Sequence, residues 1–472
     1  ATRCFQKENK RNEFDFEVID MEKIRISDHF SFGKILKYTL APVCMMIFSS
    51  IYTIVDGFFV ANFASKEAFT AVNLIFPVIM IVAGVGFMFG TGGSAFVAAL
   101  FGKKEDEKAR QAFSMVIYCS IILGAILSII FFFLVEPIVH ASASVNPDTS
   151  AKTIENAILY GKIMIAGEVF FVLQNTFQPF FSVAEKPGLG FVFTLAAGLS
   201  NMLLDYVLIG VLHLGVAGAA IASLIGMMVG SVGPLLYFSF NKKNRIYLGK
   251  PEWNFIDLGK IMINGSSEFV SCISSSIVTM AFNIQLLKYV GENGVSAYGI
   301  IMYVSYVFAA IFIGYSIGIS PVISYNYGAK NKKELTSLFK KSLILIAIAA
   351  LCMWGLAEAS SVPFSKMFSS GSAELEALSE KAMRIYSFSY LIMGFTMFGS
   401  SFFTALNNGL ISAVISIART VGFQLLFVIV LPLLMDVDGI WWSIVFAEIC
   451  SNLMTTIFLL TNAKKYGYYT NK

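Results

Sequence analysis

From residue 36 to residue 462 the chain alternates between long apolar runs and short polar segments. A helix that crosses the hydrocarbon core of a bilayer needs about 20 apolar residues, and twelve runs reach that length. They span residues 36–62, 69–101, 110–134, 153–182, 188–210, 216–240, 262–290, 295–327, 336–357, 380–405, 409–434 and 438–462. Runs so long and uniformly apolar are not barrel strands, so the pattern predicts an all-α integral membrane fold. The second and eighth runs are long, and we expect tilt there, or kinking near Pro77 and Pro321.

Composition supports a membrane protein and excludes other classes. Of 472 residues, 57% are hydrophobic and 14% are charged, whereas a soluble fold needs roughly 25% charged residues. The net charge of +4 gives no argument for nucleic acid as a partner. Six Cys and three His are scattered, so we expect no disulfide framework and no zinc site. The first 37 residues are polar, which argues against a cleavable signal peptide, and Met21 is one of two open choices for the natural start.

Lys and Arg predict the orientation, because cytoplasmic loops are enriched in them. From residue 21 onward, the segments on the side of the two termini carry 22 of these residues, and the opposite segments carry six. Both termini should therefore be cytoplasmic, in the inner cell membrane. An even number of spans is required, which agrees with twelve.

The sequence also repeats itself. Residues 40–104 align without a gap on residues 266–330 at a shift of 226, and a shift of 221 relates later glycines. The repeat predicts two six-helix lobes with the same orientation, related by an axis along the membrane normal. The expected parts are a polar tail (1–35), an N-lobe (36–240), a cytoplasmic linker (241–261), a C-lobe (262–462) and a C-terminal tail (463–472). Parallel lobes are typical of alternating-access transporters, although a duplicated channel or enzyme is the other interpretation.

Four oxygen-bearing side chains of the N-lobe are predicted to meet at one depth. Asp56, Asp205 and Ser223 lie roughly 9, 8 and 11 Å from the outer helix ends at about 1.5 Å of rise per residue. Asn201 precedes Asp205 by four residues and so shares its face. These oxygens suit Na⁺, with Asp56, Asn201 and Asp205 as ligands, or protons. A capped helix end with a solvated Asp205 is the alternative.

The C-lobe has no such cluster, since the repeat places Phe282, Gly422, Leu426 and Ile444 at the four positions. The coupling ion should therefore bind only in the N-lobe.

Five other charged residues lie well inside the apolar runs, namely Lys162, Glu168, Glu268, Arg419 and Glu448, and each is a functional hypothesis by default. We assign Asn175, Gln178 and Glu268 to the substrate cavity, although Glu268 could equally be solvated at the cytoplasmic mouth. Arg419 and Glu448 lie at mid-depth in neighbouring runs, which favours a structural ion pair. Glu168 and Lys162 have no assigned partner.

Catalytic and nucleotide-binding motifs are missing from the sequence. The glycines of GFMFGTGGSAF (86–96) resemble a phosphate loop, but Val97 and Lys104 stand where Gly and Ser or Thr are needed. Small residues within an apolar helix indicate close packing instead. We therefore expect neither an enzyme nor an ATP-driven pump.

Several stretches resemble one family, the bacterial multidrug-export branch of the multidrug and toxic compound extrusion (MATE) family. They are YTIVDGFFVANF (52–63), AVNLIFPVIM (71–80), GTGGSAFVAALFGKK (90–104), AEKPGLG (184–190), NMLLDYVLIG (201–210), GVAGAAIAS (215–223) and ISPVISYNYGAKN (319–331). The resemblance covers about residues 33–465 and is specific, because these motifs recur together at the family's spacing.

The resemblance implies a two-lobe antiporter that exports amphipathic, often cationic drugs in exchange for Na⁺ or H⁺, without another cofactor. The family's N-lobe coupling residues match Asp56, Asn201, Asp205 and Ser223, and an acid used by some members matches Glu268. A further acid used by others is absent from residues 385–405, which argues against coupling in the C-lobe. A flippase for lipids or lipid-linked precursors is the alternative function. We expect a monomer.

Overall fold

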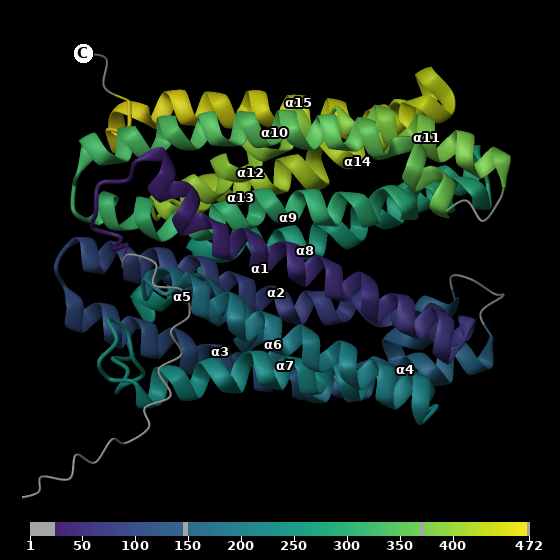
Figure 1. Cartoon of the computed structure of the whole chain (residues 1–472), viewed down its shortest axis with the longest axis horizontal. Helices are drawn as coiled ribbons and strands as arrows, with labels where there is room; N and C mark the ends of the chain where they lie inside the picture. Colours follow the sequence, from purple (N-terminus) through teal and green to yellow (C-terminus); the bar gives the residue numbers. More distant parts are fainter. Residues whose placement is uncertain (1–23, 145–149, 369–371, 470–472) are drawn as a thin grey trace, which may run out of the picture.

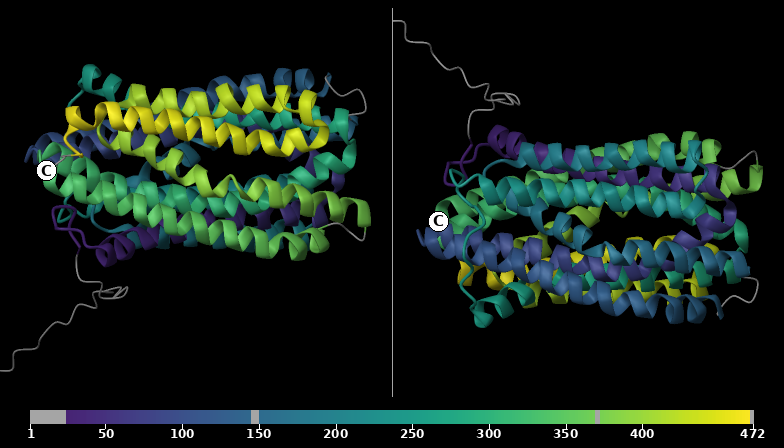
Figure 2. Two further views of the ribbon diagram at one scale, coloured as in Figure 1. Left: turned by 90° about the horizontal axis from the view of Figure 1, so that it is seen from above. Right: turned by 90° about the horizontal axis from the view of Figure 1, so that it is seen from below.

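The computed structural model of the chain describes residues 24–144, 150–368 and 372–469, and within them every regular element is helical. The predicted all-α membrane fold is thus confirmed, with helices running along one common direction (Figures 1 and 2). The elements are α1 (Phe32–Phe59), η1 (Val60–Ala64), α2 (Lys66–Gly102), α3 (Asp106–Ser144), α4 (Ala151–Ala166), α5 (Glu168–Val183), α6 (Pro187–Asp205), η2 (Tyr206–Val211), α7 (Gly215–Phe240), α8 (Phe255–Tyr289), α9 (Glu292–Gly328), α10 (Lys332–Phe368), α11 (Ala373–Ser387), α12 (Tyr390–Ala405), α13 (Gly409–Ile417), η3 (Ala418–Gln424), α14 (Leu425–Val430) and α15 (Pro432–Tyr466), where η denotes a π-helical segment. Met21 lies outside the described residues.

The number of membrane spans follows from helix length and hydropathy. Among the described residues, ten helices are long and apolar enough to cross a bilayer, or up to twelve if two bent pairs each form one span. The pairs are α4 with α5, bent by 54°, and α11 with α12, bent by 48°. Helix α1 begins and α15 ends at the same end of the molecule, called here the terminal end (Figure 1).

Several helix limits differ from the sequence prediction. Helices α3 and α10 extend about ten residues beyond the predicted runs 110–134 and 336–357. Most of the predicted loops 135–152 and 358–379 is therefore helical. Hydropathy detects only the part of a helix that contacts lipid, whereas backbone hydrogen bonding continues past it. Helices α2 and α9 continue through Pro77 and Pro321.

The break in the fourth span is at Gly167, which lies between α4 and α5. A Cβ at Gly167 would lie 1.9 Å from Cδ1 of Leu224 on α7. A side chain at this position would therefore displace Leu224, which packs against the break between α4 and α5.

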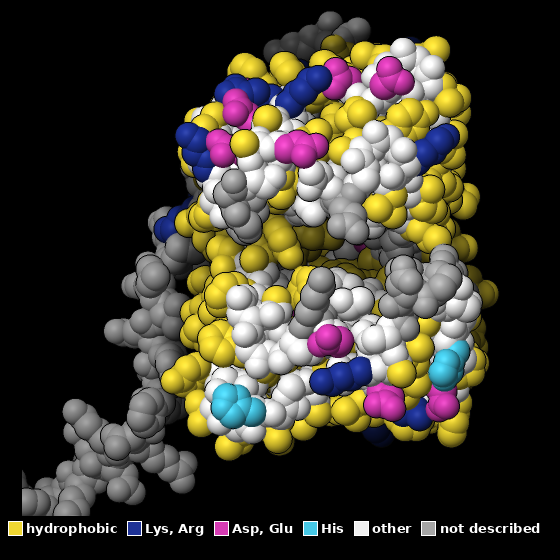
Figure 3. Space-filling model, turned by 90° about the vertical axis from the view of Figure 1, so that its right-hand side faces the viewer, with side chains coloured by type: hydrophobic (Ala, Val, Ile, Leu, Met, Phe, Trp, Pro, Cys, Tyr) yellow, Lys and Arg dark blue, Asp and Glu magenta, His cyan; other side chains and the backbone are white. Residues whose placement is uncertain are grey.

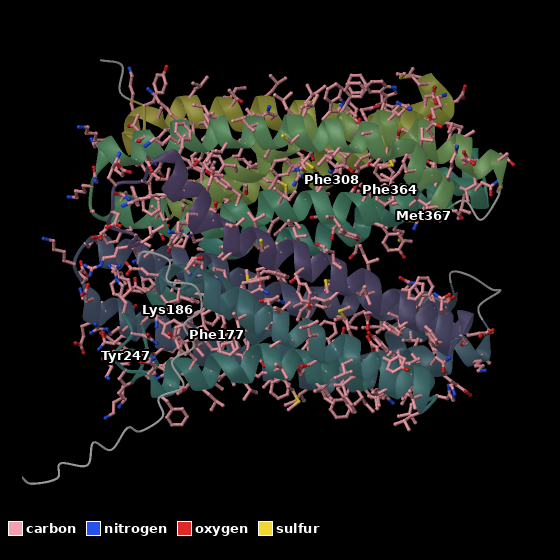
Figure 4. The ribbon with its side chains drawn as sticks, viewed as in Figure 1. Phe177, Lys186, Tyr247, Phe308, Phe364 and Met367 are labelled. Carbon is pink, nitrogen blue, oxygen red and sulfur yellow. The ribbon has the colours of Figure 1, made fainter. Side chains whose placement is uncertain are left out.

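The N-lobe and the C-lobe each have an apolar core. Most of the N-lobe core lies between Val60 and Ile261, and it includes Phe177, whose ring stacks on Phe238 with centroids 5.7 Å apart (Figure 4). In the C-lobe, Phe308 packs edge-on against Tyr390 at 5.1 Å (Figure 4). The start of α1 crosses between lobes, because side chains from Ile24 to Tyr38 belong to the C-lobe core.

The two lobes meet at helix crossings that are related to each other by the sequence repeat. Helix α1 packs against α9, and its counterpart α8 packs against α2. A Cβ at Gly102 would lie 2.0 Å from the carbonyl oxygen of Tyr325, and a Cβ at Gly328 would lie 2.0 Å from that of Ala99. Both glycines, and both carbonyl partners, are related by the shift of 226. The contact is therefore reciprocal, as an axis between the lobes demands.

The first contacts that close the terminal end come from the segment before α1. The backbone N–H of Ile26 donates to Glu185 Oε1 of the N-lobe at 3.1 Å. The backbone N–H of Phe30 donates to Glu334 Oε1 of the C-lobe at 2.9 Å, and His29 Nδ1 lies 2.6 Å from Glu334 Oε2. One short segment thus binds a carboxylate from each lobe.

A second contact across the terminal end comes from Arg245 in the linker. Arg245 forms an ion pair with Glu185. Its guanidinium also lies 4.5 Å from the ring centroid of Phe101 on α2 and 5.4 Å from that of Tyr325 on α9. Since α2 and α9 belong to different lobes, this cation–π contact joins them.

The opposite end, called here the open end, is hollowed between the lobes. The space-filling view shows this hollow with mainly apolar side chains visible on its walls (Figure 3). The structure therefore holds a conformation closed at the terminal end and open at the other.

Candidate functional site

The four predicted oxygen-bearing residues of the N-lobe converge, although they come from three helices. Asp56 lies on α1, Asn201 and Asp205 on the last turns of α6, and Ser223 on α7. Asn201 Nδ2 donates to Ser223 Oγ at 3.3 Å, and Ser223 Oγ donates to Asp56 Oδ1 at 3.4 Å. The cluster therefore links α1, α6 and α7 through side chains alone.

Asp205 is the least satisfied member of the cluster. Its side chain is fully buried, and no described residue donates a hydrogen bond to either carboxyl oxygen. The charge of Asp56, whose side chain is partly exposed, acts on this carboxyl group. Two adjacent carboxylates repel each other, and a buried one without donors is costly, so the pair needs a shared proton or a cation.

The donor set suits a hard cation or a proton. All the groups are carboxyl, amide or hydroxyl oxygens, which Na⁺ prefers to nitrogen or sulfur ligands. Asn201 Oδ1 is also buried without a partner among the described residues, so it is available as a third ligand beside Asp56 and Asp205. No group of three or more His, Cys, Asp or Glu side chains converges anywhere in the described part of the chain.

The backbone changes from α-helical to π-helical close to both carboxylates. Helix α1 becomes π-helical at Val60, four residues after Asp56, and α6 does so directly after Asp205. A π-helical turn is wider than an α-helical one and is frequent at functional sites. Hydropathy gives no signal for such turns, so the sequence did not predict them.

Tyr160 on α4 is a member of the site that sequence reasoning missed. It is buried and comes from α4, which packs against α7, the helix that carries Ser223. The charges of Asp56, Asp205 and Glu168 act on it. A buried tyrosine hydroxyl normally finds a polar partner, which is the signal that could have found it. With 19 tyrosines in the chain, residue type alone does not single it out.

The residues assigned to the substrate cavity lie in different surroundings. Asn175 and Gln178 on α5 are only 3% and 7% exposed. Helix α5 packs closely on α2 here, since a Cβ at Gly90 would lie 2.7 Å from the carbonyl oxygen of Asn175. Glu268 on α8 is partly exposed, unlike the other two.

Arg419 and Glu448 are in direct contact between η3 and α15. Arg419 Nε and Nη2 both lie 2.7 Å from Glu448 Oε1. The Glu448 side chain is fully buried and that of Arg419 is 17% exposed. The charge of Arg419 also acts on Glu268, because α8 packs against η3.

Lys162 and Glu168, which had no assigned partners, behave differently from each other. Lys162 Nζ lies 3.2 Å from Glu136 Oε2, and the Glu136 side chain is exposed to solvent or lipid. Glu168 is fully buried, and neither of its carboxyl oxygens has a hydrogen-bond partner among the described residues.

The C-lobe counterpart of the carboxyl site is apolar. Phe282, which occupies the position of Asp56, is buried and stacks on Tyr298 with ring centroids 4.9 Å apart. Aromatic packing therefore replaces the oxygen-bearing side chains at this point of the repeat.

Comparison with known proteins places these features in context. The sequence model of the MatE family matches residues 42–207 and 269–430. The multidrug export protein MepA of Staphylococcus haemolyticus (strain JCSC1435) is 26% identical over 442 residues, which cover 91% of this chain and 94% of that protein. MepA of Staphylococcus aureus (strain NCTC 8325) is 24% identical over 435 residues, again covering 91% and 94%.

Solved structures show the same fold. A multidrug resistance MATE family transporter of the MOP superfamily in an outward-facing conformation superposes with a TM-score of 0.87 at 20% identity, covering 93% of this chain and 98% of that one. A crystal structure of MATE in complex with MaL6 gives the same TM-score, identity and coverage.

Proposed function

The chain belongs to the MatE family of multidrug export transporters, and on that premise we propose that it is a secondary active antiporter that exports amphipathic or cationic organic compounds in exchange for Na⁺ or H⁺. The family consists of transporters rather than enzymes, and its members are multi-pass membrane proteins. The antiporter acts by alternating access, as a monomer and without a resident cofactor.

One observation carries the proposal, namely the carboxyl pair of Asp56 and Asp205 in the N-lobe. Asp205 is buried without hydrogen-bond donors among the described residues, whereas Asp56 beside it is partly exposed. A cation or proton can therefore reach the pair past Asp56 and relieve the repulsion between the carboxylates. The conformation with the two carboxylates close together is therefore favoured when an ion or proton is bound and disfavoured when none is. This difference allows an ion gradient to drive a conformational change.

Helix α1 transmits the effect of ion binding to both lobes. It carries Asp56, packs against α6 of the N-lobe, and packs against α9 of the C-lobe. When an ion draws α1 and α6 together, the wall of the hollow changes shape. Ion and substrate then oppose each other's binding, and this linkage drives export.

The direction of transport follows from the predicted cytoplasmic termini. The terminal end is then cytoplasmic and closed, and the hollow opens outward (Figure 3). Glu268, which is partly exposed, attracts the cationic substrate, and Asn175 and Gln178 join it only when α5 separates from α2. Aromatic rings hold flat cations by stacking and cation–π attraction.

The test is efflux of an ethidium-like dye from proteoliposomes with separately imposed Na⁺ and pH gradients. We expect one gradient to drive efflux and the variants Asp56→Asn and Asp205→Asn to lose that dependence. Asp438→Asn, at an exposed ion pair with Lys381, is the matched control and should retain it. Undiminished gradient-dependent efflux by Asp56→Asn would remove Asp56 from the mechanism, and transfer of a fluorescent lipid without dye efflux would favour a flippase.

A further inference from the structure

A pocket at the terminal end of the C-lobe has no part in the proposed antiport mechanism. It has a volume of about 190 Å³ and lies where the turn between α9 and α10 meets the end of α15. It is lined by Asn326, which is only 2% exposed, and by Tyr327 and Tyr466, whose ring centroids are 5.8 Å apart. The aliphatic part of Lys332 is held against Gly467, where a Cβ would lie 2.7 Å from Lys332 Cδ. The pocket is therefore built from packed elements of three helices.

Three lysines, Lys330, Lys332 and Lys465, give this pocket a positive charge that the protein does not neutralise. None of the three forms an ion pair with a described residue. Glu334, the acid nearest in sequence to the turn, is buried and accepts the backbone N–H of Phe30 instead. Like charges around one pocket repel each other, so a bound anion stabilises the arrangement.

The N-lobe has the same turn without this concentration of charge. The shift of 226 relates Lys104 to Lys330, and both have a left-handed backbone, with φ of 64° and 56°. At the positions of the other two lysines, the shifts of 226 and 221 place Asp106 and Asn244. The three positive charges are therefore a property of the C-lobe and do not follow from the shared fold.

The surroundings of the pocket also differ between the lobes. The N-lobe counterpart of Tyr466 is Arg245, which pairs with Glu185 and lies 4.5 Å from the ring centroid of Phe101. Its charge is thus balanced within the protein. In the C-lobe, the hydroxyl of Tyr466 accepts a hydrogen bond from Asn408 Nδ2 at 2.8 Å, which leaves its own proton available to a ligand.

The location of the pocket favours a lipid over a soluble anion. Helices α9, α10 and α15 are each long and apolar enough to cross a bilayer, and the pocket lies at their common end (Figure 1). On α15, Leu453, Ile457 and Leu460 are 62%, 60% and 64% exposed. Their spacing of four and three residues makes one stripe, which continues to Lys464 beside the pocket. An acyl chain on this stripe places its headgroup next to Lys465.

We propose that this pocket binds the phosphate headgroup of an anionic phospholipid, with the ammonium groups of Lys330, Lys332 and Lys465 around the phosphate and the hydroxyl of Tyr466 donating to it. Basic pockets between membrane-spanning helices suit such headgroups, and each lysine near the membrane surface contributes roughly five-fold in affinity. The bound lipid holds the ends of α9, α10 and α15 together. The site does not depend on the proposed antiport function.

Native mass spectrometry of the purified full chain, titrated with dioleoyl phosphatidylglycerol, tests the site. We expect one lipid to bind more tightly than any further ones, and dioleoyl phosphatidylcholine not to replace it. The triple variant Lys330→Gln, Lys332→Gln and Lys465→Gln should weaken this binding by roughly 100-fold. If the triple variant does not fold, Lys465→Gln alone should weaken it by roughly five-fold.

The control is a second triple variant that removes the same charge from exposed lysines elsewhere at the terminal end, namely Lys103→Gln, Lys104→Gln and Lys250→Gln. It should bind the lipid as the wild type does. An equal loss in the two triple variants would mean general attraction to a basic surface and would overturn the proposal. Equal binding of phosphatidylcholine would overturn it as well, and so would complete displacement of phosphatidylglycerol by inorganic phosphate, which would indicate a site for a soluble anion.

Discussion

Replacing Glu448 by Gln would leave the guanidinium of Arg419 without its charged partner inside the C-lobe. The present contact is close, with two nitrogens of Arg419 at 2.7 Å from one oxygen of Glu448. The Gln side chain keeps the size of Glu and can accept one hydrogen bond, but it carries no charge. The substitution therefore tests the charge pair rather than the packing.

The expected cost is large because the pair is shielded from water. Breaking a buried ion pair by removing one partner costs about 3–5 kcal/mol. Glu448 is fully buried, but Arg419 is 17% exposed and also faces Glu268, so we expect the lower end, about 3 kcal/mol. An unfolding entropy of about 2.1 cal/mol/K per residue gives about 1 kcal/mol/K for this chain. The apparent Tm should then fall by about 3 °C.

The assay is thermal unfolding of the purified protein, followed by the fluorescence of its four tryptophans. The double variant Arg419→Met with Glu448→Gln removes both charges and should recover most of the loss. Asp438→Asn is the control, because its ion pair with Lys381 is 39% and 58% exposed and is worth only about 0–1 kcal/mol. It should lower Tm by less than about 1 °C.

Two outcomes would refute the reasoning. A loss in Glu448→Gln no larger than that in Asp438→Asn would mean that the buried pair contributes no more than an exposed one. A double variant whose loss equals the sum of the single losses would mean that the two charges do not act on each other. Dye efflux by the double variant, if normal per folded molecule, would also support a structural role for the pair.

Two shorter predictions concern the contacts between lobes. Gly265→Val should sharply reduce the yield of monodisperse protein, because a Cβ would lie 1.9 Å from the carbonyl oxygen of Met88, whereas Gly299→Val, in open space, should not. Equal yields would contradict the close crossing. Glu334→Ala should speed hydrogen exchange in residues 24–35, which lose the contacts at Phe30 and His29, and unchanged exchange there would show that Glu334 does not hold the segment.

The order and number of the spans could be predicted from the sequence because about 20 apolar residues in succession have few uses other than crossing a bilayer. The helix ends could not be predicted in this way, because the backbone stays helical beyond the apolar residues that contact lipid. This error had a consequence for Lys162, whose partner Glu136 was assigned to a loop but lies on the extension of α3. The bend at Gly167 also escaped prediction, because hydropathy is high enough for a single span across the two helices that it separates.

The approach of Asp56, Asn201, Asp205 and Ser223 could be predicted because equal depth and a spacing of four restrict where side chains can point. The lack of hydrogen-bond donors around Asp205 could not be predicted, because it depends on the side chains that all the neighbouring helices place near it. Tyr160 escaped for the same reason, as its place in the site follows from the packing of α4 against α7.

The reciprocal contacts of Gly102 and Gly328 have an evolutionary consequence. A surface that pairs with its own repeat equivalent is isologous, so two separate copies of one six-helix unit could associate through the same crossing. Fusion into one polypeptide preserves that pairing and frees each copy to diverge. One copy could then keep an aspartate at position 56 for the driving ion, while the other fills position 282 with a phenylalanine.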